Sequence, residues 1–183
     1  FMRTTLEQAS KTLAPIMLME CYENISPSMG NILNLLILIS GIFGMILIRK
    51  LLYPKRIRNE LVGLIATLVL AVPATIILLF VGKVALPAVI VSFCISCAAY
   101  TGSVLFMSFY ANSFVKYHKN ATVAGVINAA NAVGMIAAGY GFLRISEVWN
   151  WQMVIGLQVG IIAVSIVLLL IIVPTYRKFK KML

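Results

Sequence analysis

The chain has 183 residues, of which 62% are hydrophobic and only 11% are charged. Soluble domains carry about 25% charged residues, and a water-soluble fold could not bury this much apolar surface. The formal net charge of +10 does not indicate a nucleic-acid partner, because the lysines and arginines lie at the ends of apolar stretches and are not gathered on one face of a soluble domain.

The first segment, residues 1–28, is interpreted as part of an incomplete helix followed by an outer loop. Residues 13–19 form an apolar run too short to span a membrane, and the Phe-Met start suggests a fragment, a processed chain or a misplaced start. Residues 3–11 are polar, and a charged group at mid-bilayer costs about 2.5–3.5 kcal/mol on insertion scales. We therefore expect residues 3–11 to lie on the outer membrane surface.

Five longer apolar stretches predict membrane-spanning helices. About 20 residues, at a rise of about 1.5 Å each, cross a hydrocarbon core of about 30 Å. The expected spans are residues 29–48, 61–80, 84–109, 121–142 and 151–173. The predicted fold is an all-α, polytopic transmembrane helix bundle of about five complete spans plus a partial N-terminal helix. Residues 29–175 form the five-span bundle, and residues 176–183 form a basic cytoplasmic tail.

The distribution of positive charge predicts the orientation of the bundle. Eleven of the 15 lysines and arginines lie in residues 49–58, 116–119 and 177–181, which alternating spans place on one side. Because basic loops face the cytoplasm, we expect a multi-pass protein of the cell (plasma) membrane with a cytoplasmic C-terminus. Trp151 and Tyr176 flank the last span, where interfacial aromatic residues are expected.

Several segments resemble a known transporter family. Residues 12–15 (Thr-Leu-Ala-Pro), 20–22 (Glu-Cys-Tyr) and 25–28 (Ile-Ser-Pro-Ser) resemble the end of the seventh helix of major facilitator superfamily transporters, most closely the branch of sugar-phosphate and glycerol-phosphate permeases. Residues 119–129 are similar to the opening of the eleventh helix, and residues 149–151 to the entry of the twelfth. The family's signature loop would fall at residues 44–53, where Gly44 and Arg49 match but Ile48 replaces the acidic residue.

The resemblance covers nearly the whole chain as the C-terminal half of such a transporter. It implies a secondary carrier for a small organic anion or organophosphate, working by alternating access with an N-terminal half. The implied partners are the lipid bilayer, an N-terminal half-transporter polypeptide or segment, and a small-molecule substrate. Two alternatives stay open: a truncated, non-transporting remnant of such a carrier, and a membrane assembly or scaffold protein.

Polar residues inside the spans are the candidates for a substrate pathway. In the third span Ser92, Ser96, Tyr100 and Ser103 fall on one helical face, which should face protein or a water-filled cavity. The resemblance makes this span the tenth helix, which lines the substrate pathway in the family, and makes Tyr100 the best single candidate for substrate contact. The alternative is that these hydroxyls only join neighbouring helices.

Asn128 and Asn131 in the fourth span form either inter-helix hydrogen bonds or ligand contacts. No Lys or Arg lies within the predicted spans, so this half is expected to supply no cation at depth for an anionic substrate. Cys94 and Cys97 are interpreted as packing residues. Since the sequence has no nucleophile–base pair, phosphate loop or metal-ligand motif, we expect no enzyme activity, no metal and no cofactor.

Overall fold

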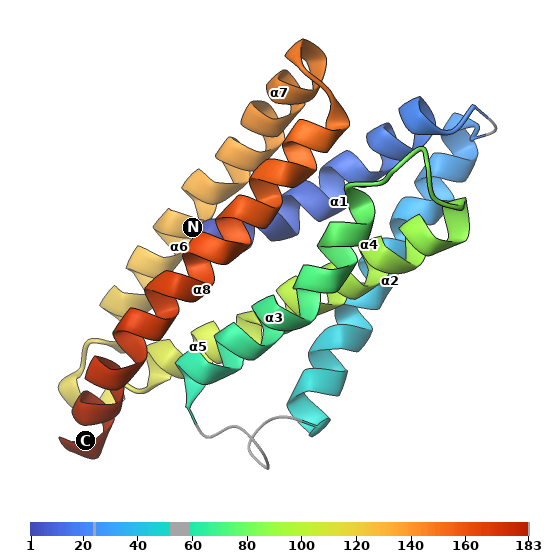
Figure 1. Cartoon of the computed structure of the whole chain (residues 1–183). Coiled ribbons are helices and arrows are strands. Elements are labelled where there is room, and N and C mark those ends of the chain that lie inside the picture. The colour runs from blue at the N-terminus through green and yellow to red at the C-terminus, as the bar shows by residue number, and fades with distance from the viewer. Residues whose placement is uncertain (24, 52–58, 183) are drawn as a thin grey trace.

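The computed structural model describes residues 1–23, 25–51 and 59–182, and all regular elements in these ranges are helical. The elements are α1 (Met2–Cys21), α2 (Pro27–Leu51), α3 (Glu60–Leu78), α4 (Leu86–Gly102), α5 (Val104–Asn112), the 3₁₀-helix η1 (Val115–Tyr117), α6 (Asn120–Ile136), the π-helix η2 (Ala137–Phe142), α7 (Leu143–Val148) and α8 (Trp151–Met182) (Figure 1). The predicted signature loop runs into residues 52–58, which lie outside the described residues.

Among the described residues, five stretches are long and apolar enough to cross a membrane, which confirms the predicted all-α, polytopic bundle. They are Pro27–Lys50, Glu60–Leu78, Leu86–Tyr117, Asn120–Val148 and Trp151–Lys180. Large apolar side chains remain on the outside of the bundle: Phe43 is 67% exposed and Ile171 is 65% exposed. Such surfaces are tolerated by lipid and not by water, so the fold indicates a multi-pass membrane protein.

Three of these stretches differ in detail from the simple helices that were expected. The third is interrupted at Ser103, whose hydroxyl donates a 2.5 Å hydrogen bond to the Tyr100 carbonyl and so competes with the helical backbone bonds. The fourth widens into η2 before continuing as α7. The fifth continues through Pro174 and the basic tail, since α8 ends only at Met182.

The placement of residues 3–11 on the outer membrane surface is wrong. These residues belong to the 20-residue helix α1, which packs against α2, α4, α6 and α8. Leu6 and Ala14 are fully buried, and Glu7 is only 9% exposed. In Figure 1 the first residues of α1 lie about midway along α6 and α8, inside the bundle. Ion pairs along α1 and bonds to neighbouring helices compensate its charges, which makes burial possible.

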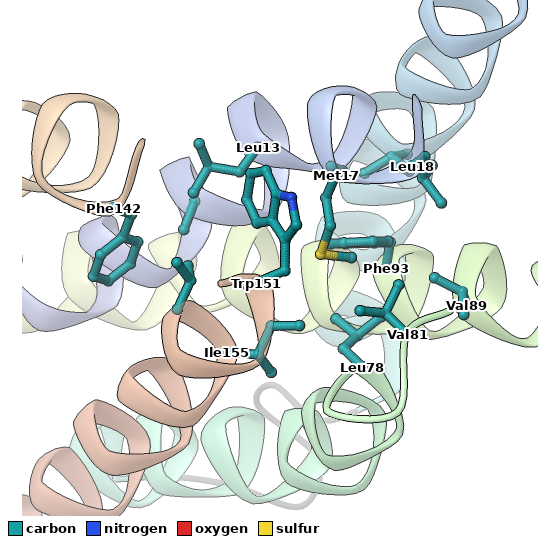
Figure 2. Packing of buried hydrophobic residues seen from close by; sticks show 14 of the residues in the cluster. Leu13, Met17, Leu18, Leu78, Val81, Val89, Phe93, Phe142, Trp151 and Ile155 are labelled. Carbon is teal, nitrogen blue, oxygen red and sulfur yellow. The ribbon is translucent and has the colours of Figure 1, made fainter. Parts of the chain in front are cut away.

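Buried side chains around α1 form the main hydrophobic core. Leu13, Met17 and Leu18 from α1 pack with Phe93 of α4 and Trp151 of α8 (Figure 2). A second cluster joins Leu6 to residues of α3, α4 and α8, and a third lies at the end of the bundle where α3, α5 and α8 meet. The first two clusters therefore pack around α1, which carries three charged side chains in its first half.

Candidate functional site

Three charged residues follow one another along one face of α1. Arg3, Glu7 and Lys11 are spaced four residues apart, so their side chains are neighbours on the helix. Arg3 Nη1 lies 2.5 Å from Glu7 Oε2, and Lys11 Nζ lies 2.5 Å from Glu7 Oε1. We call this group the charged stack. Its two cations and one carboxylate leave one excess positive charge inside the bundle.

Neighbouring helices form further hydrogen bonds with the charged stack. From α4, the Tyr100 carbonyl accepts a 3.2 Å bond from Arg3 Nη1, and Thr101 Oγ1 donates a 3.2 Å bond to Glu7 Oε1. Thr4 Oγ1 accepts a 2.9 Å bond from Arg3 Nη2 and donates a 2.5 Å bond to Asn131 Oδ1 of α6. The guanidinium is therefore held at the junction of α1, α4 and α6.

A cavity of about 240 Å³ lies beside Arg3. Its lining comes from α1, α5 and α6: Arg3, Val104, Met107, Ser108, Ala111, Asn112, Ala124, Ile127, Asn128 and Asn131. We call it the Arg3 cavity. One guanidinium, three side-chain amides and a hydroxyl face mostly apolar walls, which is the composition of a site for a small polar ligand. Arg3 Nε is buried and has no hydrogen-bond partner among the described residues.

A second cavity, of about 350 Å³, also borders Arg3. It shares Arg3 and Met107 with the Arg3 cavity and is otherwise lined by Phe1, Met2, Ser103 and residues of α3 and α8. Met107 is a flexible, unbranched side chain that can change rotamer at low cost. Arg3 and Met107 are thus the residues that the two cavities have in common.

The polar stripe of the third span, which consists of three residues of α4 and Ser103 after it, is buried. Ser92, Ser96, Tyr100 and Ser103 are each no more than 2% exposed. Ser92 Oγ donates a 2.8 Å bond to the Ala88 carbonyl, and Tyr100 Oη lies 3.1 Å from Thr75 Oγ1 of α3. Ser96 Oγ has no hydrogen-bond partner among the described residues. Of the four, Ser103 lines the second cavity beside Arg3, and the other three lie outside the linings of both cavities.

The two asparagines of α6 both reach the Arg3 cavity. Asn131 lines the cavity and also accepts the hydrogen bond from Thr4, so it both contributes to the cavity wall and joins α6 to α1. Asn128 also lines it but is exposed. The structure therefore brings Asn128 and Asn131 to one place with Arg3, and leaves Ser92, Ser96 and Tyr100 in helix contacts.

Sequence-based reasoning missed Arg3, Glu7 and Lys11. The expectation that this half supplies no cation at depth is wrong, because Arg3 lines a cavity among the candidate spans. The signal was present in the sequence: opposite charges spaced four residues apart can neutralise one another along a helix face and so enter a bundle. In comparisons with known proteins, no family model, no curated protein and no solved structure matches this chain.

Proposed function

We propose that this chain is one half of a secondary carrier of the major facilitator type, which moves a small organic anion or organophosphate across the cell membrane. The observation that carries the proposal is the charged stack beside the Arg3 cavity. An ionisable group among membrane spans is costly and usually serves a substrate or ion pathway. The excess positive charge of the stack favours an anion.

The chemistry of Arg3 suits a carboxylate or a phosphate group. A planar guanidinium forms paired, charge-assisted hydrogen bonds with such groups, and its orientation is already set by Glu7, Thr4 and the Tyr100 carbonyl. The amides of Asn128 and Asn131 can donate to further oxygens of the same ligand. A cavity of about 240 Å³ favours a small anion over a bulky one.

Glu7 acts in this proposal as the internal counter-ion of Arg3. In the unliganded site it neutralises the guanidinium, and an arriving anion shares Arg3 with it. Lys11 and Thr101 hold the other carboxylate oxygen of Glu7, so the carboxylate keeps partners when the anion binds. The site can therefore change its ligand without leaving a buried charge unpaired.

The exposed surface of α6 supports the need for a partner half. The middle of α2 exposes many large apolar side chains, for example Ile42, Phe43 and Leu47, as lipid-facing residues should be. α6 also exposes small and polar residues, including Thr122, Gly125 and Asn128, between apolar ones such as Val126. An asparagine facing hydrocarbon has no partners, so this face is better covered by another membrane-embedded helix bundle. Alternating access would then be a rocking of the two halves about the Arg3 cavity.

The orientation follows from the charges. Residues 116–119 and 177–181 would face the cytoplasm, in accordance with the positive-inside rule. The opposite end of the bundle, which carries Glu20 and Arg144, would face the outside of the cell. Labelling of single cysteines at Lys178 and Arg144 from one side of intact cells tests this orientation, and equal labelling at both positions contradicts it.

Binding of glycerol 3-phosphate to the purified chain, measured by titration calorimetry in detergent micelles, tests the proposal. We expect Arg3→Gln to weaken binding by about tenfold or more, because a lost charge-assisted hydrogen bond costs about 1.5–3 kcal/mol. The matched control is Arg144→Gln, which removes an arginine that is 67% exposed and should leave binding unchanged. Equal affinities for wild type and a folded Arg3→Gln variant would refute the role of the site in anion transport.

A further inference from the structure

At the end of the bundle that carries the basic residues 177–181, a buried carboxylate joins α3 to α8. Glu60 is the first residue of α3 and is 5% exposed. Lys180 Nζ, from the last turns of α8, lies 2.6 Å from Glu60 Oε1 and 2.8 Å from Glu60 Oε2. Tyr176 Oη, one turn earlier on α8, donates a 3.1 Å bond to Glu60 Oε2 and lies 3.3 Å from Ser113 Oγ. Both carboxylate oxygens are thus bound by α8.

Aromatic rings reinforce this contact between α8 and the end of α5. Tyr176 lies 5.3 Å from Tyr110 and Phe179 lies 5.4 Å from Phe114, measured between ring centroids. Leu61 and Val173 are buried in the same cluster. The last turns of α8 therefore pack on α3 and α5 through one ion pair and one layer of rings.

A cavity of about 450 Å³ opens at this end. We call it the basic-end cavity, and it is lined by Glu60, Phe109, Asn112, Ser113, Val115, Lys116 and Lys180. Asn112 also lines the Arg3 cavity. The ion pair between Glu60 and Lys180 is therefore part of the wall of a cavity that meets the anion site through a shared residue.

We propose that the Glu60–Lys180 pair is a latch. While it is formed, it pins the last turns of α8 to α3 and α5. When it breaks, the end of α8 moves away and the basic-end cavity widens toward the Arg3 cavity. The two partners differ in exposure: the Glu60 side chain is 6% exposed and that of Lys180 is 37% exposed. Such a pair is strong enough to hold a helix end, yet it can be reached by solvent and ions on one side.

The unequal burial also explains why release would lead to movement. If Lys180 moved away, the buried carboxylate of Glu60 would keep the Tyr176 hydroxyl as its remaining side-chain partner among the described contacts. A buried charge with too few partners is unfavourable, so Glu60 would move toward water at the expense of the packing between α3 and α8. The latch proposal therefore concerns the position of α8, and it does not depend on anion binding at Arg3.

Thiol labelling of Leu61→Cys tests the latch directly. Leu61 is 6% exposed, lies next to Glu60 and packs in the cluster that contains Val173 and Tyr176. The reporter is placed in a chain whose Cys21, Cys94 and Cys97 are replaced by alanine, and the full chain is reconstituted in vesicles with a membrane-impermeant maleimide. We expect Lys180→Gln and Glu60→Gln to raise the labelling rate roughly two- to fivefold, the shift that follows from losing one partly exposed ion pair.

Matched variants separate release of the latch from general loosening. Lys180→Arg keeps the positive charge and should label at the wild-type rate, whereas Lys178→Gln removes a neighbouring exposed lysine and should have no effect. Tyr176→Phe keeps the ring layer and should give a smaller rise than Lys180→Gln. A cysteine at Lys50, exposed at the end of α2, should label equally in all variants. An unchanged Leu61→Cys rate in Lys180→Gln, or an equal rise in Lys178→Gln, overturns the proposal.

Discussion

Trp151 Nε1 donates a 2.7 Å hydrogen bond to Glu20 Oε2, and this bond ties the first residue of α8 to the last turn of α1. The indole is only 7% exposed and lies against Leu13 and Met17 in Figure 2. Because the indole N–H is a donor with no other role, the bond fixes how α8 begins. The start of the longest helix is thus set by the helix that carries the charged stack.

Replacing Trp151 by phenylalanine should destabilise the bundle. The variant loses the hydrogen bond to Glu20, and since that carboxylate is exposed we expect a cost near the lower end of the range for charged partners, about 1–2 kcal/mol. The measurement is the midpoint of thermal unfolding in detergent micelles. Trp149→Phe is the control, because Trp149 is 67% exposed and its replacement should change stability by less than about 0.5 kcal/mol. Equal midpoints for both variants would contradict this prediction.

Gly44 should tolerate no side chain. A Cβ at this position would lie 2.4 Å from the Ala98 carbonyl oxygen, and because that atom is backbone, α2 and α4 would have to separate. We expect Gly44→Ala to cost about 1–3 kcal/mol through overpacking. At Gly160 an added Cβ meets nothing within 4 Å, so Gly160→Ala should stabilise α8 by up to about 1 kcal/mol through helix propensity. Chemical unfolding of the two variants side by side measures both effects, and a neutral Gly44→Ala would count against the packing.

Tyr100 should contribute to stability and not to anion affinity. Its hydroxyl pairs with Thr75, and it is absent from the linings of both cavities beside Arg3. A double-mutant cycle of Tyr100→Phe and Thr75→Val should give a coupling energy of about 1 kcal/mol in unfolding experiments. Titration with glycerol 3-phosphate should give the same affinity for Tyr100→Phe as for wild type. A large loss of affinity would instead assign Tyr100 the substrate contact predicted for it.

The two asparagines of α6 should respond differently to replacement by leucine. Asn131→Leu leaves the Thr4 hydroxyl without its acceptor, and we expect a loss of stability of about 1–3 kcal/mol. Asn128→Leu removes an exposed amide, so the stability of the isolated chain should change by less than about 0.5 kcal/mol. Thermal unfolding separates the two. The reverse order of effects would show that Asn128 carries the structural bond.

The five spans could be predicted because lipid imposes a simple pattern on sequence. About 20 apolar residues between charged ends determine each crossing, and the helices from Pro27 to Lys180 follow that pattern. The breaks within the spans were not predictable in the same way. The interruption at Ser103 depends on one hydroxyl bonding back to the backbone, and that choice is made by local packing.

The candidate site was only half predictable. Asn128 and Asn131 stand out in an apolar span, and they do line the cavity. Arg3 does not stand out as a buried residue, because a charge is acceptable inside the bundle only with partners from other helices. One partner is the Tyr100 carbonyl, 97 residues away from Arg3 in the sequence. The other is Asn131, which bonds to Thr4 and lies 127 residues away from it. Trp151 and Tyr176 show the same limit: both are buried, and each donates to a carboxylate that the sequence does not predict as its partner.

The π-helical stretch at Ala137–Phe142 gives the fourth span a means of turning on its own axis. A π-helical turn holds one more residue than an α-helical turn. When such a turn moves along a helix, each residue that it passes rotates by about 100° about the helix axis. Were the π-helical turn to travel toward Asn120, Asn131 would swing away from Thr4 while α7 stayed in place. Movement of the π-helical turn would then change the direction of the amides beside Arg3 without any bending of the bundle.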